Sequence, residues 1–278
     1  MFRWRKEPDG SWTGVEGRHW FRLLREESCL HVKTNGKEAD FRSLFRLDWD
    51  GHVIREELLA KAPELRPYVD ALPGLRLMRP SSACETFFCF LCTPNNNVTR
   101  ITSMVRHLAS YGEPIEGTPI ENATRFPIAE RIAEIEESDL RNRSFGYRAA
   151  TIPSIAKELV QRGGSDYLAH LSAGSYALAH EELCSFKGIG PKLADCICLF
   201  ALDHTEAVPV DTHLWQAATS LYFPEWQGTA LTDQRYRAIG SHFRERFGKL
   251  AGWAHQYLFY DNMLNWRSRR TAKGQSRC

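Results

Sequence analysis

The sequence predicts an α+β protein in which a small antiparallel β domain precedes a mostly helical body. Three observations support this prediction. Short aromatic and β-branched runs separated by turn residues occupy the first 34 residues. Helical periodicity dominates from residue 80 onward, and a glycine-rich helical hairpin lies at 183–202. We therefore expect a β domain with short helices at 1–79, a helical body at 80–266 and a basic tail at 267–278.

Three runs in the N-terminal part have the composition of strands, at 12–17, 18–25 and 29–34. Asp9-Gly10 and Asn35-Gly36 are turn dipeptides at the borders of this region. Leu30 and Val32 alternate with polar residues, which predicts a sheet with one solvated face. Residues 40–72 then favour short helices interrupted by prolines.

Apolar residues at helical spacing predict the elements of the body. Val98, Ile101, Val105 and Leu108 fall on one face of a helix, with Gly112 as its C-cap. Further helices are expected at 148–162, 175–186, 191–202, 211–222, 231–247 and 250–266. The tail after residue 266 carries several arginines and is expected to be a solvated end.

Composition narrows the class of protein without revealing a partner. The chain of 278 residues is 43% hydrophobic and 25% charged, as in a globular protein, and its net charge of +2 does not indicate nucleic acid. No apolar run approaches the ~18 residues of a membrane helix, and the first residues do not form a secretory signal.

Cys84, Cys89 and Cys92 have the spacing of an iron–sulfur run. Their segment is otherwise apolar and helical, so we interpret them as buried thiols in a reducing compartment.

The hairpin between 183 and 202 has the residues of a phosphate site. Gly188 and Gly190 flank a tight turn and permit backbone angles that a side chain would forbid, and Pro191 suits the first position of a new helix. Backbone N–H groups at such a helix start attract phosphate. The pattern is a helix-hairpin-helix signature.

Lys192 and Asp211 are the candidate catalytic residues. Lys192 is the second residue of the new helix, where the helix dipole disfavours a cation by about 0.3–1 kcal/mol. The same field, with partial burial, would favour the neutral nucleophilic amine. The alternative, about equally supported by this residue alone, is a solvated lysine touching a DNA phosphate. Asp211 precedes a helix and is expected to cap it, a role that does not exclude a second one.

The stretch from 183 to 215, LCSFKGIGPKLADCICLFALDHTEAVPVDTHLW, resembles the helix-hairpin-helix, Pro-Val-Asp family of base-excision DNA glycosylases. Within that family it is most similar to the 8-oxoguanine DNA glycosylases. PNNNVTRIT at 94–102, FGYRA at 145–149 and AGWA at 251–254 with Phe259 extend the resemblance over nearly the whole chain.

The resemblance implies a role for each matching residue. Lys192 would form an imine with the opened sugar, Asp211 would stabilise the positive sugar, and β-elimination would nick the strand. The flipped base would lie between Cys196 and Phe259. Asn95, Arg100, Tyr147 and Arg148 would fill the gap and contact the widowed cytosine, while Gly188, Gly190 and His213 would bind phosphate. Packing, surface ion pairs and ordinary phosphate contacts are the alternatives for these positions.

Two departures from the family pattern concern recognition of the lesion. The family glycine whose carbonyl contacts the oxidised guanine would lie before Met1, so either the true start is upstream or the protein lacks that contact and its first strands. His255 stands where the family has a glutamine that reads the edge of the base. An imidazole places its donor and acceptor differently from an amide.

The resulting hypothesis is a bifunctional DNA glycosylase and lyase acting on 8-oxoguanine or a related oxidised purine opposite cytosine. The alternatives are a glycosylase of the same fold for another oxidised or alkylated purine, and a non-catalytic helix-hairpin-helix DNA-binding module. The chemistry requires no metal or organic cofactor. We expect damaged duplex DNA as partner, a monomer without membrane association, and an intracellular location (nucleus in a eukaryote, cytoplasm or nucleoid in a prokaryote).

Overall fold

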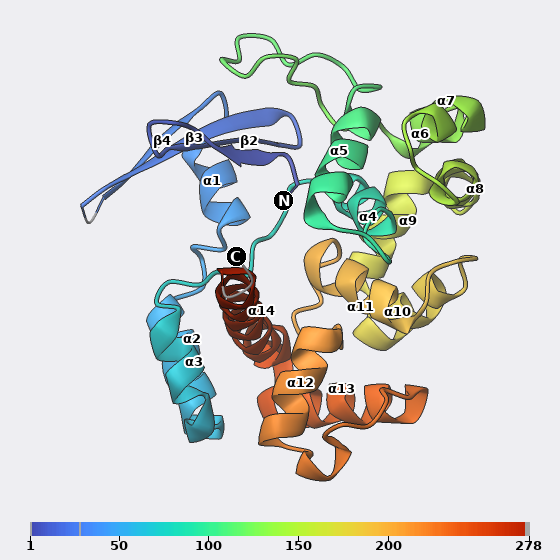
Figure 1. The fold of residues 1–278 in the computed structure, drawn as a ribbon. Helices are drawn as coiled ribbons and strands as arrows, with labels where there is room; N and C mark the ends of the chain where they lie inside the picture. The colour runs from blue at the N-terminus through green and yellow to red at the C-terminus, as the bar shows by residue number, and fades with distance from the viewer. Residues whose placement is uncertain (1, 28, 276–278) are drawn as a thin grey trace. The chain divides into compact units, whose positions relative to one another are not determined.

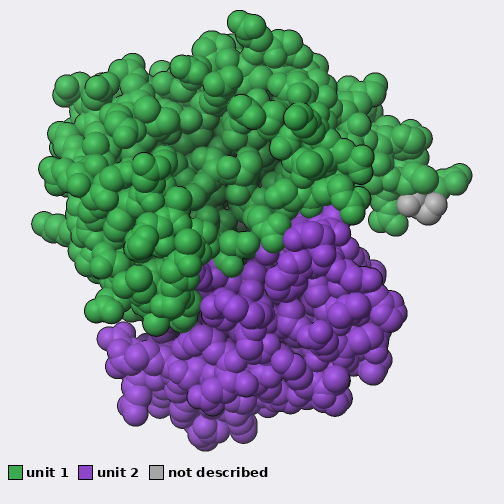
Figure 2. Space-filling model, turned by 180° about the vertical axis from the view of Figure 1, so that it is seen from behind, with its two compact units in different colours: residues 1–44, 79–203 green, residues 45–78, 204–278 purple. Residues whose placement is uncertain are grey.

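The computed structural model describes residues 2–27 and 29–275, and side chains up to Leu264. The chain forms two compact units (Figure 2). Unit 1 comprises residues 1–44 and 79–203, and unit 2 comprises residues 45–78 and 204–278. The sheet therefore belongs to the same compact unit as most helices of the predicted body. The boundary that we drew at residue 79 stays a prediction.

Unit 1 contains a four-stranded antiparallel sheet in the order β1 (Trp4–Lys6), β2 (Trp12–Glu16), β3 (His19–Glu26) and β4 (Cys29–Thr34). Strand β1 was not expected from the sequence. Trp4 pairs with Gly14, and a β-carbon at Gly14 would lie 2.2 Å from the Trp4 ring. The Trp4 indole also donates to Glu16 Oε1 at 2.7 Å. The glycine thus gives the indole room to lie across the neighbouring strand.

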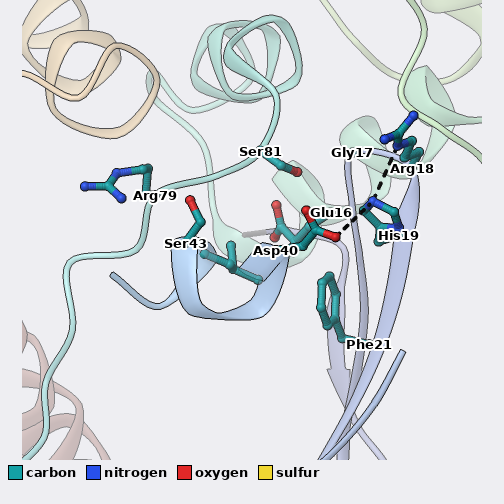
Figure 3. Close-up of a pocket in the computed structure, with 10 residues that line it drawn as sticks. Glu16, Gly17, Arg18, His19, Phe21, Asp40, Ser43, Arg79 and Ser81 are labelled. Atoms are coloured by element: carbon teal, nitrogen blue, oxygen red, sulfur yellow. Dashed lines mark hydrogen bonds and ion pairs between the residues drawn. The ribbon is translucent and has the colours of Figure 1, made fainter. Parts of the chain in front are cut away.

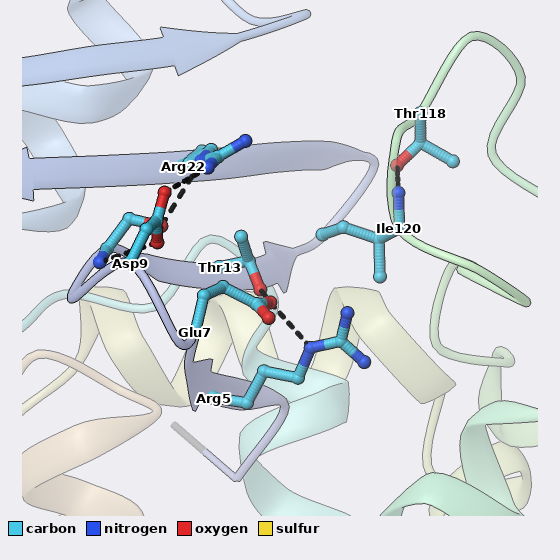
Figure 4. A network of polar contacts seen from close by, with 8 residues as sticks. Arg5, Glu7, Asp9, Thr13, Arg22, Thr118 and Ile120 are labelled. Carbon is cyan, nitrogen blue, oxygen red and sulfur yellow. Dashed lines mark hydrogen bonds and ion pairs between the residues drawn. The ribbon is translucent and has the colours of Figure 1, made fainter.

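Charged side chains fix the turn between β1 and β2 (Figure 4). Arg5 Nε donates to Glu7 Oε1 at 2.6 Å, and the Thr13 hydroxyl donates to the same oxygen. Hydrogen bonds from Ser11, through its hydroxyl and its backbone N–H, lower the pKa of Asp9 to about 2, and Arg22 adds to this effect. Ser11 and Thr13 are buried, whereas the Arg5–Glu7 and Arg22–Asp9 ion pairs are partly exposed, so each ion pair contributes little to stability.

A buried ion pair joins the sheet side of unit 1 to its helices. Arg3 Nε and Nη2 each donate to one Glu85 carboxylate oxygen at 2.7 Å, and both side chains are only 6% exposed. Burial raises the pKa of Glu85, and Arg3 acts in the opposite direction. A bidentate arginine–carboxylate pair fixes orientation as well as distance.

Two helices of unit 1 are buried along most of their length (Figure 1). These are α4 (Ala83–Leu91), buried from Glu85 onward, and α11 (Pro191–Phe200), buried from Leu193 to Leu199. They pack against each other. The other helices are α1 (Glu38–Leu44), α5 (Val98–Ala109), α6 (Ala129–Ala133), α7 (Glu137–Asn142), α8 (Arg148–Gln161), α9 (Gly164–Ala173) and α10 (Tyr176–Cys184).

Unit 2 is helical and has its own core around Trp253, which is fully buried and stacks against Trp49 at 6.3 Å. Its elements are α2 (Gly51–Lys61), η1 (Pro63–Leu65), α3 (Arg66–Ala71), α12 (Thr212–Leu221), η2 (Pro224–Trp226), α13 (Asp233–Phe247), η3 (Gly248–Leu250) and α14 (Ala251–Gln275). Helix α14 continues beyond residue 266, where we expected it to end; the side chains of the basic tail lie outside the described residues. In the described part of the chain, no helix is both long and apolar enough for a membrane crossing. The α+β prediction is confirmed.

Candidate active site

The hairpin between α10 and α11 begins directly after Phe186. Ile189 N donates to the Phe186 carbonyl at 3.1 Å, and Gly188 has a φ of 98° that favours glycine. Gly190 has an ordinary φ of −91°, so our expectation that both glycines are needed for backbone freedom is wrong for Gly190. Pro191 opens α11 as predicted. Pro191 has no N–H, and Leu193 N and Ala194 N donate to the Gly190 carbonyl at 3.0 and 2.9 Å, so Lys192 N is the donor of this helix start that a phosphate could engage.

Lys192 is the second residue of α11 and its side chain is exposed. The partial burial that we expected for this lysine is therefore absent, while its place in the first helical turn is as expected. Cys196, one turn further along, is 4% exposed and lies in the packed part of the helix. The two residues share a side of α11, but only Lys192 reaches solvent.

A buried carboxylate ties α10 to α11. The Tyr176 hydroxyl donates to Asp195 Oδ1 at 2.6 Å, and Asp195 is 1% exposed. His180 Nε2 lies 3.3 Å from the Pro191 carbonyl and 3.8 Å from Asp195 Oδ2. Burial, with a smaller contribution from Asp195, raises the pKa of Cys184, which lies 3.9 Å from His180 Nδ1. These contacts make the two hairpin helices one rigid pair, and the sequence analysis did not single them out.

The residues assigned to the opposite base lie where arginine side chains donate hydrogen bonds to the backbone of two loops of unit 1. Arg100 Nη2 donates to the Ser144 carbonyl at 2.6 Å. Arg148 Nη2 donates to the Pro94 carbonyl of the other loop. Asn95 is exposed and has a positive φ of 49°, which asparagine tolerates better than most residues. The structure thus brings Asn95, Arg100 and Arg148 together.

Tyr147 and Arg148 differ sharply in exposure. Tyr147 is 57% exposed, as a wedge between base steps would require. Arg148 is 3% exposed, and its guanidinium lies 4.6 Å from the centre of the Tyr147 ring. In this arrangement Arg148 supports the ring and the loop at Pro94. A direct contact of Arg148 with cytosine stays a prediction.

In unit 2, Asp211 caps α12. Its Oδ1 accepts hydrogen bonds from His213 N at 2.9 Å and from Leu214 N at 2.8 Å. The expected capping role is present in the structure. The carboxylate is partly exposed, so its second oxygen is not enclosed by the cap.

The other predicted residues of unit 2 form one cluster around Phe259. His255 stacks on Phe259 with ring centres 5.8 Å apart and planes 13° apart. His213 meets the same ring edge-on at 5.7 Å. His213 Nδ1 lies 2.9 Å from Asn262 Oδ1, within hydrogen-bonding distance. Asn262 was missed by the sequence analysis, although its spacing of three from Phe259 places both on one side of α14.

Other features of unit 1 lie apart from the predicted residues. A cavity of about 400 Å³ lies between the β2–β3 turn, α1 and the segment near Ser81, and His19 and Asp40 face each other in it at 3.5 Å (Figure 3). Burial raises the pKa of Cys84 and of Cys92 to about 12, which favours the protonated thiol. Among the side chains that the structure describes, no group of three or more His, Cys, Asp or Glu is placed to hold a metal ion.

Comparison with proteins of known sequence reveals relatives over nearly the whole chain. An N-glycosylase/DNA lyase OGG1 from Arabidopsis thaliana is 32% identical over 268 residues, which cover 93% of this chain and 73% of that protein. An N-glycosylase/DNA lyase from Saccharomyces cerevisiae is 33% identical over 214 residues, covering 67% of this chain and 56% of that protein. No family model matches the chain.

Solved structures also show similarity to glycosylase/lyases. The 8-oxoguanine glycosylase/lyase of Clostridium acetobutylicum, in complex with double-stranded DNA containing cytosine opposite 8-oxoguanine, superposes with a TM-score of 0.84. The two chains are 27% identical, and the match covers 95% of this chain and 89% of that one. The resemblance inferred from the sequence motifs is confirmed.

Proposed function

The chain belongs to the N-glycosylase/DNA lyase family, and from this premise we propose that it removes 8-oxoguanine opposite cytosine from duplex DNA and then nicks the strand by β-elimination. It is a base-excision-repair enzyme. The observation that carries the assignment of residues is the pair of helix starts at Lys192 and Asp211. One start presents an exposed amine beside a hairpin suited to phosphate, and the other presents a carboxylate.

Each residue has one role in the proposed mechanism. The Asp211 carboxylate stabilises the positive charge that develops on the sugar as its bond to the base breaks. The Lys192 ammonium first loses a proton to solvent, and the resulting amine forms a bond to C1′. The bonded nitrogen then loses another proton, and the ring oxygen takes up a proton as the sugar ring opens to give an imine. The imine acidifies the C2′ proton, and its loss expels the 3′ phosphate from C3′. The base leaves in the first stage and the strand is cut in the second.

Duplexes that differ only in the damaged base test this function. Each duplex is incubated with the protein, and released base and nicked strand are measured separately. Release of 8-oxoguanine followed by nicking is expected. Release of an alkylated purine in preference to 8-oxoguanine would instead support the alternative substrate class. Association with duplex DNA as a monomer is part of the proposal and is measured by sedimentation of the complex.

Cytosine opposite the lesion is expected to be preferred over the other three bases. The reason is the group of Asn95, Arg100 and Arg148, which meets beside the exposed Tyr147 ring. Arginine forks donate well to the acceptors of an extruded cytosine. Single-turnover excision opposite each of the four bases measures the preference, and equal rates would refute it.

Binding to duplex DNA should weaken steeply as the salt concentration rises, because phosphate contacts release counterions.

His255→Gln is expected to raise discrimination between 8-oxoguanine and guanine, or to leave it unchanged. The buried imidazole lies flat against Phe259, whereas an amide offers a donor and an acceptor in one plane for the edge of a base. One restored contact is worth on the order of 1 kcal/mol, about fivefold in the ratio of excision rates. The measurement is that ratio for the two proteins. A large loss of 8-oxoguanine excision would show that His255 is adapted to a different lesion.

A further inference from the structure

Arg162 occupies the junction of three helices in unit 1. It follows α8 directly, and its guanidinium contacts α9 and the last turn of α10. Nη1 donates to Ser185 Oγ at 2.7 Å and to the Tyr167 hydroxyl at 3.1 Å, and Nη2 donates to Glu158. Nη1 also lies 3.4 Å from both the carbonyl and the carboxylate of Glu182. We call Arg162 and these four partners the Arg162 cluster.

The cluster holds the point from which the hairpin departs. The guanidinium carbon lies 4.0 Å from the centre of the Phe186 ring, which is 1% exposed. The Phe186 carbonyl accepts the hydrogen bond from Ile189 that closes the turn. The cation lies at the C-terminal end of α10, where the helix dipole favours it. Movement of Arg162 would therefore change the start of the hairpin.

Helix α8 connects this cluster to the residues assigned to the opposite base. Tyr147 and Arg148 stand at its beginning, and Arg162 follows its last residue. At 1.5 Å per residue its 14 residues span about 21 Å. The hairpin also passes near the beginning of α8, because a β-carbon added at Gly188 would lie 3.6 Å from Thr151 Cγ2. The hairpin thus lies close to α8 at two places and is held there by Arg162 at one of them.

Contacts of Asp195 and His180 join α10 to α11, so a chain of contacts leads from Arg162 to the helix that carries Lys192. We propose that Arg162 is a positioning residue for the glycosylase and lyase reaction. It fixes the hairpin that carries Lys192 at a set distance from Tyr147 and Arg148, so that the nucleophile is placed correctly when the opposite base is engaged. The inference rests on the proposed function for the role of Lys192. A displacement of about 1 Å in a nucleophile is enough to cost up to 10²-fold in rate.

The test uses a duplex with a preformed abasic site, because imine formation there requires no recognition of a damaged base. With all DNA bound by excess protein, borohydride trapping is timed for wild type, Arg162→Met and Arg162→Lys. Arg162→Met should trap at least tenfold more slowly with less than a threefold change in Kd. Arg162→Lys should recover part of the rate, since an ammonium reaches Ser185 but cannot stack flat on Phe186. Arg141→Met is the matched control, because Arg141 pairs with Glu137 on neighbouring α7 without touching α10.

A trapping rate for Arg162→Met within twofold of wild type at saturation would overturn the proposal, whatever happens to its melting temperature. If that variant does not fold, Ser185→Ala, which removes one acceptor of the cluster, should slow trapping at least threefold, and an unchanged rate overturns the proposal. The link to the opposite base is tested by the ratio of the trapping rate opposite cytosine to the trapping rate opposite adenine. This ratio should be at least threefold smaller in Arg162→Met than in wild type, and an unchanged ratio overturns that link. If wild type traps the abasic site but releases no 8-oxoguanine, the proposed substrate is wrong, and the trapping rates still decide the role of Arg162.

Discussion

Lys192→Gln should abolish the borohydride-trapped adduct and reduce strand nicking by on the order of 10³-fold or more. Glutamine cannot form an imine, and an exposed position in the first turn of α11 tolerates it without loss of packing. Removing a cation from the positive end of the helix is expected to leave stability unchanged or raise it by about 0.3–1 kcal/mol. Loss of the reaction together with unchanged or higher thermal stability would identify a chemical role for the side chain.

Lys187→Gln is the matched control for this experiment. Lys187 is exposed and lies in the same hairpin, five residues before Lys192. Its loss removes one positive charge next to the DNA and should weaken binding modestly, while the adduct still forms. Undiminished trapping by Lys192→Gln, or loss of trapping only in Lys187→Gln, would contradict the assignment of the nucleophile.

The hairpin could be predicted closely from sequence because glycine and proline mark its limits. Pro191 begins α11 as expected, and the end of α10 differs by two residues from the predicted end at 186. The sheet was predicted less well. Strand β1 has only three residues and too little periodicity to be recognised, and Leu30 is 49% exposed although alternation placed it on the buried face. Strand β4 is an edge strand, so its side chains are covered less than those of inner strands.

Candidate positions for the chemistry could be proposed from sequence motifs, whereas the groups that contact them could not. Asp211 follows a recognisable motif and caps its helix as expected. The contacts of Arg162 join residues up to 24 positions apart in sequence, and that of His213 with Asn262 joins residues 49 apart. No local pattern encodes such contacts. The exposure of Lys192 and the burial of Arg148 likewise depend on tertiary packing, which sequence periodicity does not determine.

Asp211→Asn should lower the rate of base release by on the order of 10²–10³-fold, as expected when one group that stabilises transition-state charge is lost. The structure makes this substitution selective. Asp211 Oδ1 accepts two backbone hydrogen bonds, and an asparagine carbonyl oxygen can accept both, because asparagine caps helices about as well as aspartate. Folding and DNA binding should therefore be retained while the negative charge is removed.

Asp211→Ala provides the comparison that separates the two roles of this residue. It removes the charge and the cap together, so base release should fall to a similar level and stability should fall by typically ~1 kcal/mol. Thermal melting of both variants, with single-turnover release of 8-oxoguanine under enzyme excess, distinguishes the contributions. Imine trapping on a preformed abasic site should fall less than base release in Asp211→Asn, because the glycosidic bond is already broken there. Full base-release activity of Asp211→Asn would mean that the aspartate only caps α12, and the charge that stabilises the sugar would then have to come from another group.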